Sequence, residues 1–117
     1  MKPDTGSLTV FTNNNGGILD DLIVSNTSRG FLYVVSNAGC AQKDYAHLKQ
    51  AEEMMRSSGA DVRVERIDDK GLLAVQGPKM NEILEAAVKF DVKKLPFMGT
   101  IESSVFGIDG CRVTRCG

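Results

Sequence analysis

Two adjacent aspartates interrupt an otherwise aliphatic segment that follows a glycine pair near the start of the chain. Residues 18–25 read Ile-Leu-Asp-Asp-Leu-Ile-Val-Ser. Successive side chains of a β-strand point to opposite faces, so Asp20 is the only polar residue on its face, whereas Asp21 shares its face with Ser25. A carboxylate on an apolar face costs free energy unless a partner compensates it. Asp20 is therefore the first candidate for a functional residue, and an acidic pair at a solvent-facing strand end is the alternative.

Turn and cap residues divide the rest of the chain into short strands and two helices. The run Asn13–Gly17 predicts a tight turn, Gly59 a helix C-cap, and Asp109-Gly110 a hairpin turn. Strands are expected over residues 8–12, 18–25, 31–36, 62–67, 72–76, 99–106 and 111–115, and helices over residues 40–58 and from residue 78 to about 88.

This order of elements predicts an α+β fold. From residue 31 onward it reads β-α-β-β-α-β, a ferredoxin-like unit with an extra N-terminal β-hairpin and a C-terminal hairpin strand. We expect two domains: residues 1–30 as the N-terminal hairpin and residues 31–117 as the ferredoxin-like domain. Within the strand over residues 31–36, alternation places Tyr33 and Val35 on one face together with Asn37, which follows the strand.

Composition excludes several classes of function. The 117 residues carry a formal net charge of -1 and no tryptophan, which disfavours nucleic-acid binding. No apolar run approaches the roughly 20 residues that span a bilayer, and no hydrophobic leader follows Met1. A single histidine, His47, is expected at the surface, and a metal site is not expected. The odd set Cys40, Cys111 and Cys116 predicts free thiols in a reducing compartment.

Six blocks of the sequence resemble one known family. They are NGGILDDLIV at 15–24, LYVVSNAGC at 32–40, LAVQGP at 73–78, KLPFM at 94–98, VFG at 105–107 and GCRVTRCG at 110–117. In this order and spacing they resemble the aminomethyltransferases, or T-proteins, of the glycine cleavage system. The resemblance runs from end to end and is similar to the eukaryotic, mitochondrial form.

The resemblance implies a chemistry and a set of site residues. In this family an aminomethyl group on the dihydrolipoyl arm of the lipoylated H-protein is transferred to tetrahydrofolate, and ammonia is released. It implies that Asp20 is catalytic, lying against the reactive nitrogens of folate, and that Tyr33, Val35 and Asn37 line the folate site. It also implies a mitochondrial matrix location, although this chain shows no transit peptide.

The family's proteins are several times longer, so the resemblance implies that this chain is a central fragment. Residues 1–30 would then be the remnant of a first folate-binding domain, and the second domain would be C-terminally truncated. Apolar surface exposed by truncation could allow self-association. Two alternatives remain open: the folate domain of a dimethylglycine or sarcosine dehydrogenase or of an iron–sulfur assembly factor, and a non-catalytic ferredoxin-like module.

Overall fold

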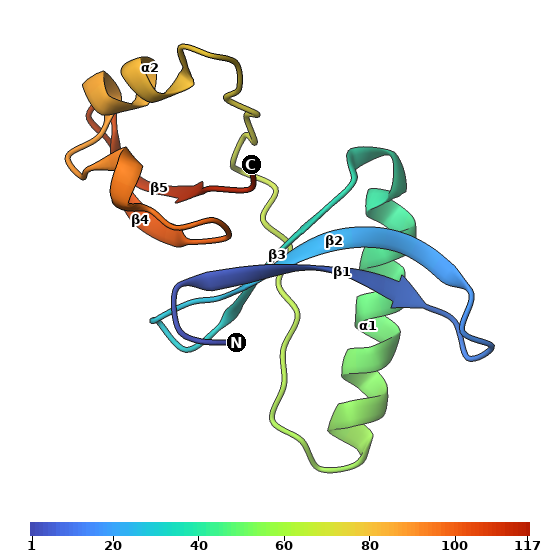
Figure 1. The fold of residues 1–117 in the computed structure, drawn as a ribbon. Coiled ribbons are helices and arrows are strands. Elements are labelled where there is room, and N and C mark those ends of the chain that lie inside the picture. Colours follow the sequence, from blue (N-terminus) through green and yellow to red (C-terminus); the bar gives the residue numbers. More distant parts are fainter. The chain divides into compact units, whose positions relative to one another are not determined.

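The computed structural model describes residues 1–117 and confirms a mixed α+β fold, with five strands and two α-helices (Figure 1). The chain forms two compact units. The terminal unit comprises Met1–Ser7, Ile23–Val34 and Leu73–Gly117, and the central unit comprises Leu8–Leu22 and Val35–Leu72. The division expected near residue 30 stays a prediction.

The first sheet has the strand order β1-β2-β3. Its strands are β1 (Thr5–Thr12), β2 (Ile18–Asn26) and β3 (Leu32–Ser36). The predicted turn between β1 and β2 is confirmed. The Asn13 side-chain oxygen accepts hydrogen bonds from the backbone N–H groups of Asn15, at 2.9 Å, and Gly17, at 2.8 Å. Gly16 has a φ of 79°, which glycine adopts without a steric penalty. This turn sets the start of the strand that carries Asp20.

The long helix α1 (Ala41–Ser57) follows the short 3-10 helix η1 (Ala38–Cys40) and ends as predicted at Gly59. Gly59 has a φ of 92°, and the N–H of Ala60 reaches the carbonyl of Met55 at 3.0 Å, as in a Schellman motif. Two contacts hold the helix on the hairpin within the central unit. The rings of Phe11 and His47 lie 5.1 Å apart, so His47 is half-buried rather than a free surface residue. Lys43 also donates to the carbonyl of Leu19 at 2.6 Å.

The terminal unit contains α2 (Met80–Ala87), the short 3-10 helix η2 (Val92–Lys94), and a hairpin of β4 (Thr100–Val105) and β5 (Ile108–Thr114). The predicted turn at residues 108–110 is wrong, because β5 already begins at Ile108. The turn is instead Phe106-Gly107, with φ angles of 49° and 80°, between the paired Val105 and Ile108. Positive φ at both central residues is the geometry of a type I′ turn, whose twist matches that of the strands. Gly110, with a φ of 72°, lies where the register shifts and so forms a bulge.

The strands predicted over residues 62–67 and 72–76 do not form, so the ferredoxin-like strand order stays unconfirmed. The charged residues that alternate through the first segment instead form exposed ion pairs. Arg63 lies 3.0 Å from Glu65, and Arg66 lies 2.7 Å from Asp68. Leu73 in the second segment is 86% exposed. An apolar run makes a strand only where a neighbouring strand pairs with its backbone.

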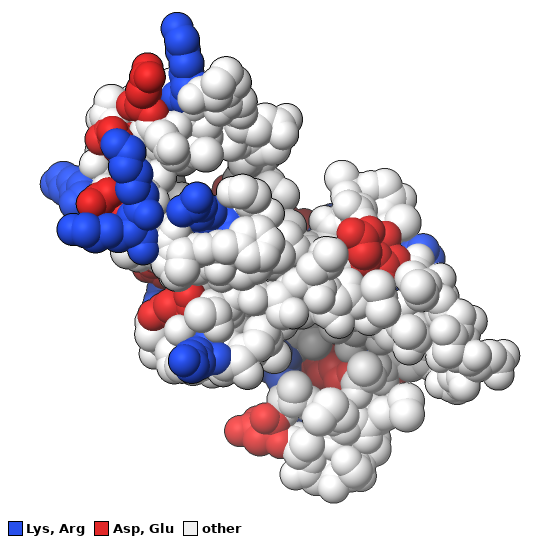
Figure 2. All heavy atoms as spheres, in the orientation of Figure 1, with Lys and Arg blue, Asp and Glu red and all other residues white.

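The surface carries charges of both signs. On the face shown in Figure 2, basic and acidic side chains lie next to one another without an extended patch of one sign. Neither helix has the length and hydropathy needed to cross a membrane. Cys40, Cys111 and Cys116 are free thiols.

Candidate functional site

Asp20 lies near the start of β2, on the strand that the Asn13–Gly17 turn begins. It is half-buried, whereas Asp21 is exposed, which agrees with the difference expected from strand alternation. Leu22, on the same face as Asp20, is 3% exposed and belongs to the buried aliphatic core. The carboxylate of Asp20 thus emerges at the edge of an apolar face, where solvation is incomplete.

Asn37 brings the end of β3 to Asp20. Its side-chain amide donates to Oδ1 of Asp20 at 3.0 Å, and the backbone N–H of Asp21 donates to the same oxygen at 3.0 Å. The Asn37 amide also lies 3.0 Å from Oδ1 and 3.2 Å from the carbonyl oxygen of Asp21. Both aspartates therefore meet one amide group, so their separation on opposite strand faces is less complete than strict alternation predicts.

These hydrogen bonds decide the charge of Asp20. The Asn37 amide, the largest influence, lowers the pKa of Asp20 below its ordinary value of 3.8, and this outweighs the opposing effect of desolvation. The sequence had suggested the reverse, that desolvation disfavours the charged form. Donors aimed at the charged form of a carboxylate stabilise it. Asp20 is consequently an ionised carboxylate at neutral pH.

A second carboxyl group, Asp44 in the first turn of α1, lies against Asp20. Asp44 is 2% exposed, and each of the two side chains shifts the pKa of the other. Burial, the largest cause, and Asp20 both raise the pKa of Asp44 above its ordinary value of 3.8. The candidate site is therefore a carboxyl pair with one member stabilised as an anion and the other disfavoured as one.

The remaining predicted residues divide between the two units. Val35, in β3, belongs to the central unit with Asp20 and Asn37 and is half-buried. Tyr33 belongs to the terminal unit, where the Arg112 guanidinium lies 5.2 Å from the centre of its ring. The structure thus brings Asn37 to Asp20. The folate-lining roles of Tyr33, Val35 and Asn37 stay predictions.

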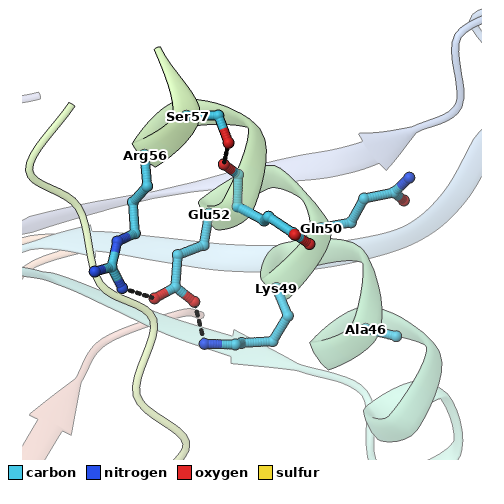
Figure 3. A pocket seen from close by; sticks show the side chains of 7 residues that line it. Ala46, Lys49, Gln50, Glu52, Arg56 and Ser57 are labelled. Carbon is cyan, nitrogen blue, oxygen red and sulfur yellow. Dashed lines mark hydrogen bonds and ion pairs between the residues drawn. The ribbon is translucent and has the colours of Figure 1, made fainter. Parts of the chain in front are cut away.

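A hollow on the surface of α1 does not coincide with these carboxyl groups. It has a volume of about 740 Å³ and lies along the second half of α1, between Ala46 and Ser57 (Figure 3). At its centre Glu52 accepts from Lys49 and lies 3.8 Å from Arg56. All its lining residues come from this one helix, so the hollow is a feature of the helix surface. We place the candidate site at Asp20 because the chemistry, rather than the volume, is concentrated there.

Sequence reasoning missed Asp44. Helical spacing predicts a buried stripe through Tyr45, Leu48, Ala51 or Glu52, and Met55. Glu52 is indeed buried, but the other buried residue of the helix is Asp44, and Met55 is 50% exposed. Asp44, Leu48 and Glu52 are spaced by four residues and so share one face of a helix. That spacing, with an acid at each end, was the signal available in the sequence. No group of three or more His, Cys, Asp or Glu side chains is arranged to hold a metal ion.

An ionised carboxylate beside an amide can accept a hydrogen bond from an N–H group of a ligand. The family of the chain comes from comparison with known proteins. The family model of the GCVT N-terminal domain matches residues 1–117, and the chain belongs to this family.

The similar proteins are mitochondrial aminomethyltransferases. That of Mus musculus is 54% identical over 117 residues, which are 100% of this chain and 29% of the mouse protein. That of Homo sapiens is 53% identical over the same shares of both chains. That of Solanum tuberosum is 41% identical over 119 residues, again 100% of this chain and 29% of the plant protein. The chain thus spans less than a third of the length of these relatives.

Proposed function

We propose that this chain contributes the carboxylate of a folate-dependent aminomethyltransferase of the glycine cleavage system. The reaction transfers the one-carbon unit of an aminomethyl-dihydrolipoyl group to tetrahydrofolate and releases ammonia. Membership of the GCVT N-terminal domain family and the names of the relatives support the proposal. The observation that carries it is the arrangement of donors around Asp20, which holds an ionised carboxylate in a half-buried setting.

Asp20 acts through Oδ1. Its other oxygen, Oδ2, is buried, so a substrate amine approaches from the side where Asn37 lies. The amine donates its N–H to the carboxylate, which orients the nitrogen and stabilises the positive charge that develops as it attacks the one-carbon unit. With its lowered pKa, Asp20 serves chiefly as this fixed negative charge. Asn37 keeps the carboxylate ionised, and Tyr33 and Val35 are proposed to line the site.

The partners and location of the protein follow from the same proposal. The aminomethyl donor is the lipoylated H-protein, and the acceptor is tetrahydrofolate as a second substrate. The relatives are named as mitochondrial proteins, and this supports the mitochondrial matrix as the location.

Binding of tetrahydrofolate to this chain tests the proposal directly. We expect isothermal titration to detect binding and Asp20→Asn to weaken it, because the amide cannot supply the negative charge. Asp21→Asn is the matched control, being exposed, and should weaken binding less. The absence of binding by the parent chain, or equal effects of the two substitutions, would contradict the proposal.

Turnover is to be measured in a protein that carries this sequence within the full length of the family. There Asp20→Asn should lower kcat by roughly 10²-fold or more while circular dichroism shows an unchanged fold. Asp21→Asn should cost much less. If only Asp21→Asn abolished turnover, the role assigned to Asp20 would be wrong.

A further inference from the structure

Asp44 is a buried acid whose two carboxyl oxygens both lack a hydrogen-bond partner. Its side chain is only 2% exposed, so bulk solvent does not reach the carboxyl group. A buried ionised carboxylate without donors is strongly disfavoured, and native proteins rarely keep one. The environment of Asp44 therefore requires an explanation that its own helix does not provide.

Asp20 also has a buried carboxyl oxygen without a hydrogen-bond partner. This oxygen is Oδ2, whereas Oδ1 is occupied by Asn37 and by the backbone N–H of Asp21. Two ionised carboxylates have only acceptors, so neither satisfies the other. One proton on the pair removes the problem, because the protonated acid donates to the oxygen of its neighbour.

We propose that Asp44 holds this proton and donates it in a hydrogen bond to Oδ2 of Asp20, as a positioning residue for that carboxylate. The proton belongs to Asp44 because the two N–H donors on Oδ1 favour the charge of Asp20, while no N–H group donates to Asp44. The pair then carries one negative charge, located on Asp20. The proton moves only between the oxygens of the two carboxyl groups, and no other bond changes.

Other groups around the pair do not reverse this assignment. Lys43 and the Ser36 hydroxyl lower the pKa of Asp44, but burial and Asp20 exceed them and the net direction is upward. Asp44 also lies in the first turn of α1, where the helix dipole favours negative charge by a modest amount. On the other side, the Cys40 side chain helps to lower the pKa of Asp20.

The consequence for catalysis rests on the proposed function. A donor fixed on Oδ2 restrains rotation of the Asp20 carboxylate and leaves Oδ1 directed toward Asn37 and the approaching amine. Asp44 does not touch the substrate, since its side chain is buried. It acts through the orientation and charge of Asp20.

Carboxyl ¹³C NMR of this chain, labelled at aspartate, measures the proposal without any substrate. We expect the Asp44 signal to titrate above the ordinary aspartate pKa of 3.8 and the Asp20 signal below it. Asp61, an exposed aspartate of the same unit, provides the control substitution. Asp20→Asn should move the Asp44 midpoint part of the way down, because the neighbouring charge is removed while burial remains. Asp61→Asn should move neither midpoint.

Two variants of Asp44 separate hydrogen bonding from simple packing. Asp44→Leu removes the donor, so the Asp20 midpoint should rise. Asp44→Asn restores a donor of similar shape, so the Asp20 midpoint should stay near that of the parent. An Asp44 midpoint at or below the ordinary aspartate pKa of 3.8 would overturn the proposal even if Asp44→Leu failed to fold. An Asp20 midpoint unchanged in a folded Asp44→Leu chain would overturn it as well.

The experiments distinguish the proposed function from the proposed proton on Asp44. A chain that shows the high Asp44 midpoint but binds no tetrahydrofolate contradicts the proposed function and leaves the shared proton standing. A chain that binds tetrahydrofolate with an ordinary Asp44 midpoint contradicts the shared proton alone.

Discussion

At the scale of single residues, Asp44 and Glu52 show how one helix face holds two buried acids differently. Both side chains are at most 5% exposed. Lys49, the largest influence, the Val64 backbone N–H and Arg56 lower the pKa of Glu52. No N–H group donates to Asp44, and burial, the largest influence, raises its pKa. Burial alone thus does not decide the charge of an acid; the supply of donors does.

Glu52→Gln should destabilise the fold at neutral pH. The pKa of Glu52 is lowered in the folded state below its ordinary value of 4.5, so its contribution is complete above that value and is lost as the pH falls through the folded pKa. We expect the substitution to lower the Tm by a few degrees at pH 7 and the difference from the parent to close under acid. Thermal unfolding followed by circular dichroism at several pH values measures this.

Glu53→Gln is the matched control, since Glu53 is the adjacent residue and its side chain is exposed. It should leave the Tm within a degree or so of the parent. A loss of stability for Glu52→Gln that is the same at every pH would show that packing, rather than charge, is responsible.

Residue-scale sequence reasoning identified Asp20 but not its chemistry. Strand alternation was sufficient to single it out, because period-two patterns report burial on one strand. The donor from Asn37 lies 17 positions further along the chain, and the carboxyl group of Asp44 lies 24 positions away. Such partners depend on how the strand and the helix pack, which the local pattern does not contain.

At the scale of elements, the end of α1 depends on Gly59. Its φ of 92° is in the left-handed region, and an added Cβ would meet no other atom there, so any cost is conformational. Gly59→Ala should therefore destabilise the chain by about 1 kcal/mol. Urea denaturation measures it as a lower midpoint with an unchanged slope.

Gly39→Ala provides the control for this cap. Gly39 also has open space around it but lacks a left-handed φ, so alanine there should change the stability by less than about 0.5 kcal/mol. If both substitutions had the same effect, the conformational explanation of the Gly59 cap would fail.

Elements were predictable where a local signal specified them. The Asn13–Gly17 turn and the Gly59 cap each contain residues whose backbone preferences decide the structure without help from elsewhere. Residues 72–76 have the composition of a strand, but no neighbouring strand pairs with them. Asp109-Gly110 was predicted as the hairpin turn, but the turn is formed by Phe106-Gly107, and Gly110 instead lies in a bulge. Pairing between strands depends on residues distant in the sequence. Local patterns therefore could not show that residues 72–76 have no neighbouring strand or which residues form the hairpin turn.

At the scale of the whole molecule, apolar side chains are unevenly shared between interior and surface. The buried hydrophobic residues are only Leu22, Ala87 and Val92, whereas Leu73 is 86% exposed and Phe106 70% exposed. Exposed apolar area of this kind favours association or binding of a partner.

We expect the purified chain to bind a hydrophobic dye and to self-associate as its concentration rises. Sedimentation velocity over a series of concentrations measures the second effect. Leu73→Gln should reduce dye binding and association, and Lys89→Gln, an exposed change that removes no apolar surface, should alter neither. A chain that stays monomeric at high concentration and binds no dye would contradict this expectation.

The first residues of the chain have a consequence for its synthesis. Within the terminal unit, the N–H of Asp4 reaches the carbonyl of Asn26 at 2.7 Å, the N–H of Gly6 that of Met98 at 2.7 Å, and the N–H of Thr100 the carbonyl of Asp4 at 3.0 Å. A ribosome adds about 5–20 residues per second, so residues 4–6 wait roughly 5–20 s for residues 98–100 to be made. The contacts between residues 4–6 and residues 98–100 therefore form late. Until they form, the edge of β1 that faces away from β2 lacks these backbone partners and is available to chaperones.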